Sequence, residues 1–197
     1  MNSVLIAMLA FAFVGAATPG PVNLLATTTA VQRGSREAFK LVLGASLAYA
    51  LVVFLSGSVM HLLVEVMPVL EVGLRWAGSV FLLYLAYQIF TAPVSDLTCA
   101  ESSSSGWWLG AVTQILNPKA WLVAMSGVSL YVVGQVDQQQ WLWKFTTVSL
   151  VCCLAGVGLW ALTGSAFARY LSQPNRQRVF NRTMAIILGA SVSMIWY

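Results

Sequence analysis

One lysine stands alone inside a long uncharged part of this sequence. Residues 102–136 contain a single charged side chain, that of Lys119, and 17 uncharged residues lie on each side of it. An ammonium group at the centre of a membrane-spanning helix costs about 2.5–3.5 kcal/mol on insertion scales. Such a group either binds an anion or gives up its proton when it is desolvated. The alternative is a lysine that extends its side chain to the membrane surface.

Proline interrupts two apolar stretches at places about half the chain length apart. The first interruption is Thr18-Pro19-Gly20-Pro21, and the second is Asn117-Pro118, directly before Lys119. A proline break inside lipid frees backbone groups, which need protein or a water-lined cavity around them. The helices that begin after each break present N–H groups and a positive dipole end. We therefore predict a pocket for a carboxylate, with these binding and gating residues: Thr18, Pro19, Gly20, Pro21, Asn23, Asn117, Pro118 and Lys119. For Asn23, a hydrogen bond in helix packing is an equal alternative.

The acidic residues limit the chemistry of this pocket. All six fall in or beside predicted loops: Glu37, Glu65, Glu71, Asp96, Glu101 and Asp137. No carboxylate is then available at mid-membrane to pair with a cationic side chain or to relay protons, which disfavours basic substrates and metal ions. The single histidine, His61, is expected near the membrane surface. No catalytic triad or metal-ligand set is present, so we expect no enzyme activity, no cofactor and no metal site.

The three cysteines raise one further alternative, a membrane electron carrier. They are Cys99, Cys152 and Cys153. Their number is odd and two are adjacent, so we expect no structural disulfide. Adjacent cysteines in one helix do not support electron shuttling.

Composition identifies the surroundings of these residues. The sequence is 59% hydrophobic and only 8% charged, with a mean hydropathy of +0.80, whereas soluble domains average about 25% charged residues. Most of the surface must therefore face lipid. The net charge of +4 is too scattered to follow a phosphate backbone, so no nucleic-acid partner is expected.

Six runs, of which five have no Asp, Glu, Lys or Arg and one has Lys119 alone, can each cross a bilayer, which takes about 20 apolar residues per helix. They are residues 1–32, 41–64, 76–95, 102–136, 145–168 and 183–197. The first run has no positive charge before Arg33, so we expect a retained span and no cleaved signal. The predicted loops are Gln32–Lys40, Glu65–Glu71, Ala92–Gly106, Gly134–Gln140 and Leu171–Arg178.

These spans predict an all-α, polytopic integral membrane protein of six transmembrane helices, with helices 1 and 4 broken at proline. We expect two three-helix repeats, residues 1–95 and 107–197, joined by a linker loop at 96–106 within one membrane domain. Three is an odd number, so the second repeat must enter the membrane from the other side, as in many secondary transporters. If loops 1–2, 3–4 and 5–6 are cytoplasmic, seven cations lie inside and two outside. Both termini are then expected outside. Gly44-x-x-x-Ala48 and Gly106-x-x-x-Gly110 permit close packing or a homodimer.

The two broken motifs resemble those of the LysE/RhtB family of bacterial amino-acid exporters. The resemblance rests on TPGPVN (Thr18–Asn23), Gly44, LYLAYQIF (Leu83–Phe90), NPKAW (Asn117–Trp121) and the arginine-rich start of the last span. It covers nearly the whole chain. It implies a multi-pass protein of the bacterial inner membrane that exports amino acids, with the proton as the expected coupling ion.

The same resemblance narrows the substrate. Family members that export basic amino acids tend to carry aspartates in helices 2 and 4, whereas the comparable stretches here are Gly44–Leu47 and Leu122–Ala124. This departure implies small neutral substrates such as serine, threonine, homoserine or cysteine-pathway metabolites. Export of another small solute or ion is the alternative within the transporter class.

Overall fold

The computed structural model describes residues 2–92, 105–168 and 170–196, and every regular element within them is helical. In chain order the elements are α1 (Asn2–Ala17), α2 (Pro21–Ser58), α3 (Met60–Thr91), α4 (Gly106–Ile115), α5 (Pro118–Tyr131), α6 (Gln138–Ala168), the 3₁₀ turn η1 (Tyr170–Ser172) and α7 (Pro174–Trp196). The prediction of an all-α chain is confirmed. Most of the predicted linker loop at 96–106, with Asp96, Cys99 and Glu101, lies outside the described residues.

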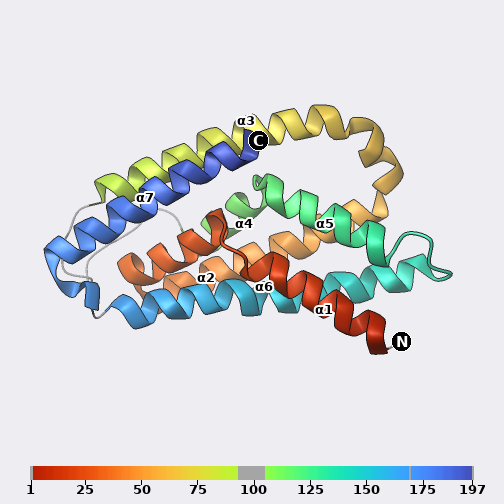
Figure 1. Cartoon of the computed structure of the whole chain (residues 1–197), viewed down its shortest axis with the longest axis horizontal. Helices are drawn as coiled ribbons and strands as arrows, with labels where there is room; N and C mark the ends of the chain where they lie inside the picture. The colour runs from red at the N-terminus through yellow and green to blue at the C-terminus, as the bar shows by residue number, and fades with distance from the viewer. Residues whose placement is uncertain (1, 93–104, 169, 197) are drawn as a thin grey trace.

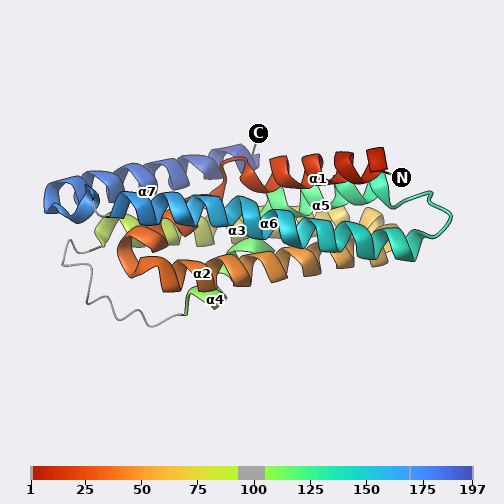
Figure 2. The ribbon, with the colours of Figure 1, turned by 90° about the horizontal axis from the view of Figure 1, so that it is seen from below.

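The helices lie along one common axis, and the broken ones meet in its middle (Figures 1 and 2). α1 starts at one end of the bundle and stops near the centre, and the first part of α2 continues towards the opposite end. The rest of α2 runs back, and α3 returns again. α4 and α5 together make one further pass, interrupted near the end of α1, and α6 and α7 follow in opposite directions.

The predicted loop Gln32–Lys40 is wrong in its extent, because helix continues on both sides of a single residue. Inside α2 the backbone is non-helical at Gly34, which has φ 82° and ψ 169°. Glycine adopts positive φ at no steric cost because it lacks a Cβ atom. The chain therefore reverses direction at one glycine, whereas the charged residues predicted a loop of nine residues.

The predicted loop Glu65–Glu71 is also wrong, because α3 is helical throughout that stretch. The turn between α2 and α3 falls earlier, at Val59, whose φ of −122° and ψ of 27° lie outside the helical range. Charged residues and a proline are typical of loops, and the stretch Glu65–Glu71 contains both. A helix that extends beyond the hydrocarbon can contain charged residues and a proline. The residues that mark the end of a membrane span therefore need not mark the end of a helix.

The core is built around α2, which packs along α6 on one side and α4 on the other, while α3 pairs with α7. Apolar side chains also cover the outside of the bundle, for example Ile6, Leu162 and Ile186, each more than 60% exposed. Within the described residues, α2 and α6 are the two helices long and apolar enough to cross a membrane by length and composition. Exposed apolar side chains on several helices suit lipid better than water.

The α2–α4 contact is a backbone-to-backbone crossing at glycines. A Cβ atom added to Gly110 would meet the carbonyl oxygen of Leu41, and one added to Gly44 would meet that of Trp107. Close approach of this kind needs small residues on both helices. The glycines that spacing marked as a packing motif therefore hold the first half of the second broken helix against α2.

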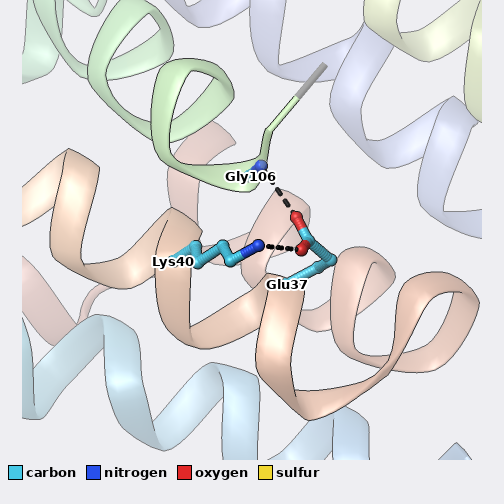
Figure 3. Close-up of polar contacts among 3 residues, drawn as sticks. All are labelled: Glu37, Lys40 and Gly106. Carbon is cyan, nitrogen blue, oxygen red and sulfur yellow. Dashed lines mark hydrogen bonds and ion pairs between the residues drawn. The ribbon is translucent and has the colours of Figure 1, made fainter. Parts of the chain in front are cut away.

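A carboxylate completes this crossing at the end of the bundle (Figure 3). Glu37 accepts a hydrogen bond from the Gly106 backbone N–H at 3.0 Å and pairs with Lys40 at 2.5 Å. The charges of residues 33–40 predict that this segment lies at the membrane surface. The hydrogen bond from Lys40, followed by that from Gly106, lowers the pKa of the Glu37 carboxyl from its ordinary value. The N-terminus of α4 is thus capped by a side chain of α2.

Candidate functional site

Two prolines free carbonyl groups at the end of α1. Pro19 and Pro21 have no backbone N–H, so the carbonyls of Gly15 and Ala17 lose the donors that a continuous helix would supply. The Ala17 carbonyl accepts a hydrogen bond from the indole Nε1 of Trp160 at 3.0 Å. That of Gly15 has no recorded partner within the part of the chain that is described, and Gly15 lines the cavity described below.

Asn23 holds the first break together. Its side-chain Nδ2 donates to the carbonyl of Ala16 at 3.0 Å and to that of Thr18 at 2.8 Å. Both amide hydrogens of Asn23 are therefore engaged with the end of α1. This geometry favours the interpretation of Asn23 as a helix-packing residue, because both of its side-chain N–H donors bind backbone carbonyls of the protein. The Thr18 hydroxyl likewise donates to the Val14 carbonyl, so Thr18 presents its backbone oxygen to the site.

The second break has its own cap. Asn117 is the N-cap of α5, and its side-chain oxygen accepts from the Lys119 backbone N–H at 3.2 Å. The indole Nε1 of Trp121 donates to the Ile115 carbonyl at 2.8 Å. The expectation of free N–H groups at the start of this half-helix is thus wrong for Lys119, because a neighbouring amide side chain satisfies that donor. Each break has one carbonyl held by a tryptophan indole.

Lys119 joins the two breaks. Its ammonium Nζ donates to the backbone carbonyl of Thr18 at 3.0 Å, across 101 positions of sequence. Lys119 forms no salt bridge with any of the described residues. An ammonium carries three N–H donors. Two of them therefore remain for another acceptor.

The first residues of α2 offer further donors beside this ammonium. Gly20 is the N-cap, with extended backbone at φ −169° and ψ 175°, and no side chain caps the helix. Val22 and Asn23 follow Pro21, and their N–H groups lie in the first turn, where no intrahelical partner exists. Gly20 also keeps the approach open, because a Cβ atom there would lie 3.5 Å from Lys119 Nζ.

A cavity lies between the two breaks. It contains about 390 Å³ of space free of protein atoms, a figure that includes the solvent space at its open mouth. Its lining combines residues of both breaks with residues of α2, α5 and α6: Gly15, Ala16, Thr18, Gly20, Val22, Asn23, Tyr49, Gln114, Asn117, Lys119, Ala120, Val123, Cys153 and Val157.

Sequence reasoning placed five of these residues at the site: Thr18, Gly20, Asn23, Asn117 and Lys119. The structure brings all five together around one cavity. Pro19, Pro21 and Pro118 do not line it. They act on the backbone, by ending one helix and starting the next.

Sequence reasoning missed the polar residues that other helices contribute. Tyr49 comes from the middle of α2, Gln114 from the last turn of α4, and Cys153 from α6. Gln114 had a usable signal, because it is an amide three residues before Asn117 inside the uncharged run. Tyr49 and Cys153 had none, since an isolated tyrosine or cysteine in an apolar helix is ordinarily a packing residue.

A cavity that joins two broken helices in an apolar bundle, with an ammonium and free backbone donors, defines a solute-binding membrane protein rather than an enzyme. Comparison with known proteins agrees with this class. The profile of the LysE type translocator family matches residues 13–195. The chain belongs to this family, and its membrane location and its role as an efflux transporter follow from that membership.

Its curated relatives are distant but cover it almost completely. It is 28% identical over 187 residues to proteins named cysteine/O-acetylserine efflux protein from Salmonella choleraesuis (strain SC-B67) and Salmonella typhimurium (strain LT2), spanning 95% of this chain and 94% of each relative. The protein of the same name from Escherichia coli (strain K12) is 27% identical over the same lengths. No solved structure matches the chain. The family resemblance stated from the TPGP and NPK motifs is confirmed.

Proposed function

We propose that this protein exports small neutral amino acids or their derivatives across the bacterial inner membrane, and that it binds their α-carboxylate between the two broken helices. The observation that carries the proposal is the position of Lys119. Its ammonium reaches the end of α1 and lies in the cavity with two free N–H donors. An anion there would accept charge-assisted hydrogen bonds, which are the strong ones.

The rest of the cavity suits a small substrate. Ala16, Ala120, Val123 and Val157 leave room for a short side chain and offer it apolar contact. No Asp or Glu is among the lining residues, so a cationic side chain would have no counter-charge. The relatives are named for efflux of cysteine and O-acetylserine, which are amino acids with short side chains that carry no positive charge.

An inverted arrangement of six spans fits the course of the chain. α1 with the first part of α2, the rest of α2, and α3 run in alternating directions, and α4–α5, α6 and α7 take the reverse directions (Figure 1). Gln32 near the Gly34 reversal hydrogen-bonds Asn181 of α7 at 3.0 Å. The two basic segments therefore share one end of the bundle, which supports their common placement on the cytoplasmic side with both termini outside.

The test is efflux from cells that overproduce the chain, measured over a panel of amino acids. We expect export of small neutral amino acids, and we expect Lys119→Ala to abolish it while the protein still reaches the membrane. The matched control is Lys144→Ala, because Lys144 is a half-buried lysine that contacts Gln140 and Trp141 outside the cavity. Export of every tested amino acid by Lys119→Ala at the wild-type rate would show that no carboxylate binds there.

We propose proton antiport as the driving mechanism. Uphill export of a zwitterion without net charge needs a coupled ion that moves down its own gradient, and we propose that this ion is the proton. A protonophore added to proteoliposomes with an imposed pH gradient should stop uphill export and leave downhill exchange intact. Uphill export that persists after the gradient collapses would exclude the proton.

A further inference from the structure

Two buried polar side chains beside the cavity have no hydrogen-bond partner among the described residues. Tyr49 is 5% exposed and Gln114 is 7% exposed, and both residues line the cavity. Neither the Tyr49 hydroxyl nor the Gln114 side-chain amide makes a hydrogen bond to any described residue. Buried polar side chains in native proteins almost always have a partner, and leaving one unpaired in apolar surroundings is costly.

These two groups differ from the other unpaired hydroxyls of the bundle. Ser46, Ser56 and Ser149 are sealed within helix contacts, with their oxygens closed off from any free space. The polar atoms of Tyr49 and Gln114 are not sealed in this way. Both residues line the cavity, so the cavity is a place where a partner for these polar groups can bind.

We propose that Tyr49 and Gln114 form a second subsite, which binds the polar group of the substrate's side chain. The inference rests on the proposed function, in which Lys119 binds the carboxylate. A phenol can donate and accept one hydrogen bond, and a carboxamide can donate two and accept others. Together they suit a hydroxyl, a thiol or an ester carbonyl on a short side chain.

This subsite sets selectivity between substrates of nearly equal size. Apolar lining residues distinguish such molecules weakly, because an added methylene or hydroxyl changes their contact little. A site whose polar groups hydrogen-bond the substrate discriminates against an analogue that lacks the bonding group, because the polar groups of the site then stay unpaired. The transporter should therefore export serine faster than alanine.

The experiment measures the ratio of serine to alanine export by proteoliposomes, with each amino acid loaded at the same concentration below saturation. The variants are Tyr49→Phe and Gln114→Met, which keep the shape of each side chain. We expect each to lower the ratio about tenfold, the factor for roughly one lost hydrogen bond, with little change in alanine export. The matched controls are Tyr131→Phe and Gln135→Met, because neither residue lines the cavity and both should keep the wild-type ratio.

Each outcome decides the inference. An unchanged ratio of serine to alanine export in Tyr49→Phe would overturn the inference, because water alone would then satisfy the hydroxyl. An equal fall in serine and alanine export would also overturn it, because that result indicates a structural role. Tyr49→Phe removes an oxygen without a protein partner, so it decides the question even where Gln114→Met fails to fold. A subsite that fails while Lys119→Ala still abolishes export leaves the proposed function standing. A wild-type protein that exports neither amino acid overturns both.

Discussion

Replacement of Lys119 by methionine should make the protein more stable and inactive at the same time. An ammonium at mid-membrane costs about 2.5–3.5 kcal/mol on insertion scales, and methionine removes this cost with a side chain of similar length. The variant loses the hydrogen bond from Nζ to the Thr18 carbonyl, which is worth about 1.5 kcal/mol for a charged donor. That carbonyl keeps its bond from Asn23, so no acceptor is left unpaired. The net gain is roughly 1–2 kcal/mol.

Two assays on one preparation measure both effects. Thermal unfolding in detergent should show a melting temperature about 2–8 °C higher for Lys119→Met, the shift that 1–2 kcal/mol gives in a chain of this size. Export from proteoliposomes should fall to the level of empty vesicles. Lys144→Met is the control, and it should change neither quantity measurably, because Lys144 lies outside the cavity and its hydrogen bond to Gln140 is exposed to solvent.

The two readouts separate a binding lysine from a structural one. A lower melting temperature for Lys119→Met would show that the ammonium stabilises the break between α4 and α5, and that the cost of burying it has been overestimated. Wild-type export by the same variant would show that the substrate is held elsewhere. Either result refutes the reasoning that a costly charge is retained for binding.

Two further predictions concern the α2–α4 crossing. Gly110→Ala should lower the free energy of unfolding by about 1–3 kcal/mol relative to Gly158→Ala, because the new methyl group meets a backbone carbonyl at Gly110 and open space at Gly158; equal melting temperatures for the two variants would contradict the tight crossing. Glu37→Ala should cost about 1 kcal/mol at neutral pH through loss of the cap on Gly106. The pKa of the Glu37 carboxyl is lowered in the folded protein. The stabilisation that this carboxylate contributes is therefore present above the ordinary carboxyl pKa and is lost as pH falls through the lowered value. The difference in free energy of unfolding between Glu37→Ala and wild type should shrink below about pH 4. A difference that stays constant down to pH 3 would show that the carboxylate charge is irrelevant.

Local backbone chemistry made much of the site predictable. Proline lacks an N–H wherever it occurs, so the ends of α1 and α4 could be located from TPGP and NP alone. A lone lysine in an apolar run is equally visible. The boundaries of α2 and α3 were not predictable in the same way, because charges mark where a chain leaves lipid and not where its helix ends. The reversal at Gly34 depends on one residue's positive φ, which the sequence permits without requiring.

By itself, the sequence determined the helical class of this protein, the position of both breaks and the residues that carry charge there. The tertiary structure decided which groups share a cavity. Tyr49, Gln114 and Cys153 come from three helices and reach the site through packing between segments far apart in the chain. The tertiary structure also decided which backbone groups at the breaks remain free, since Asn23 and two tryptophans bind carbonyl groups there and Asn117 binds an N–H group. Hydrogen bonds of this kind depend on distance and direction between side chains, and a sequence pattern contains neither.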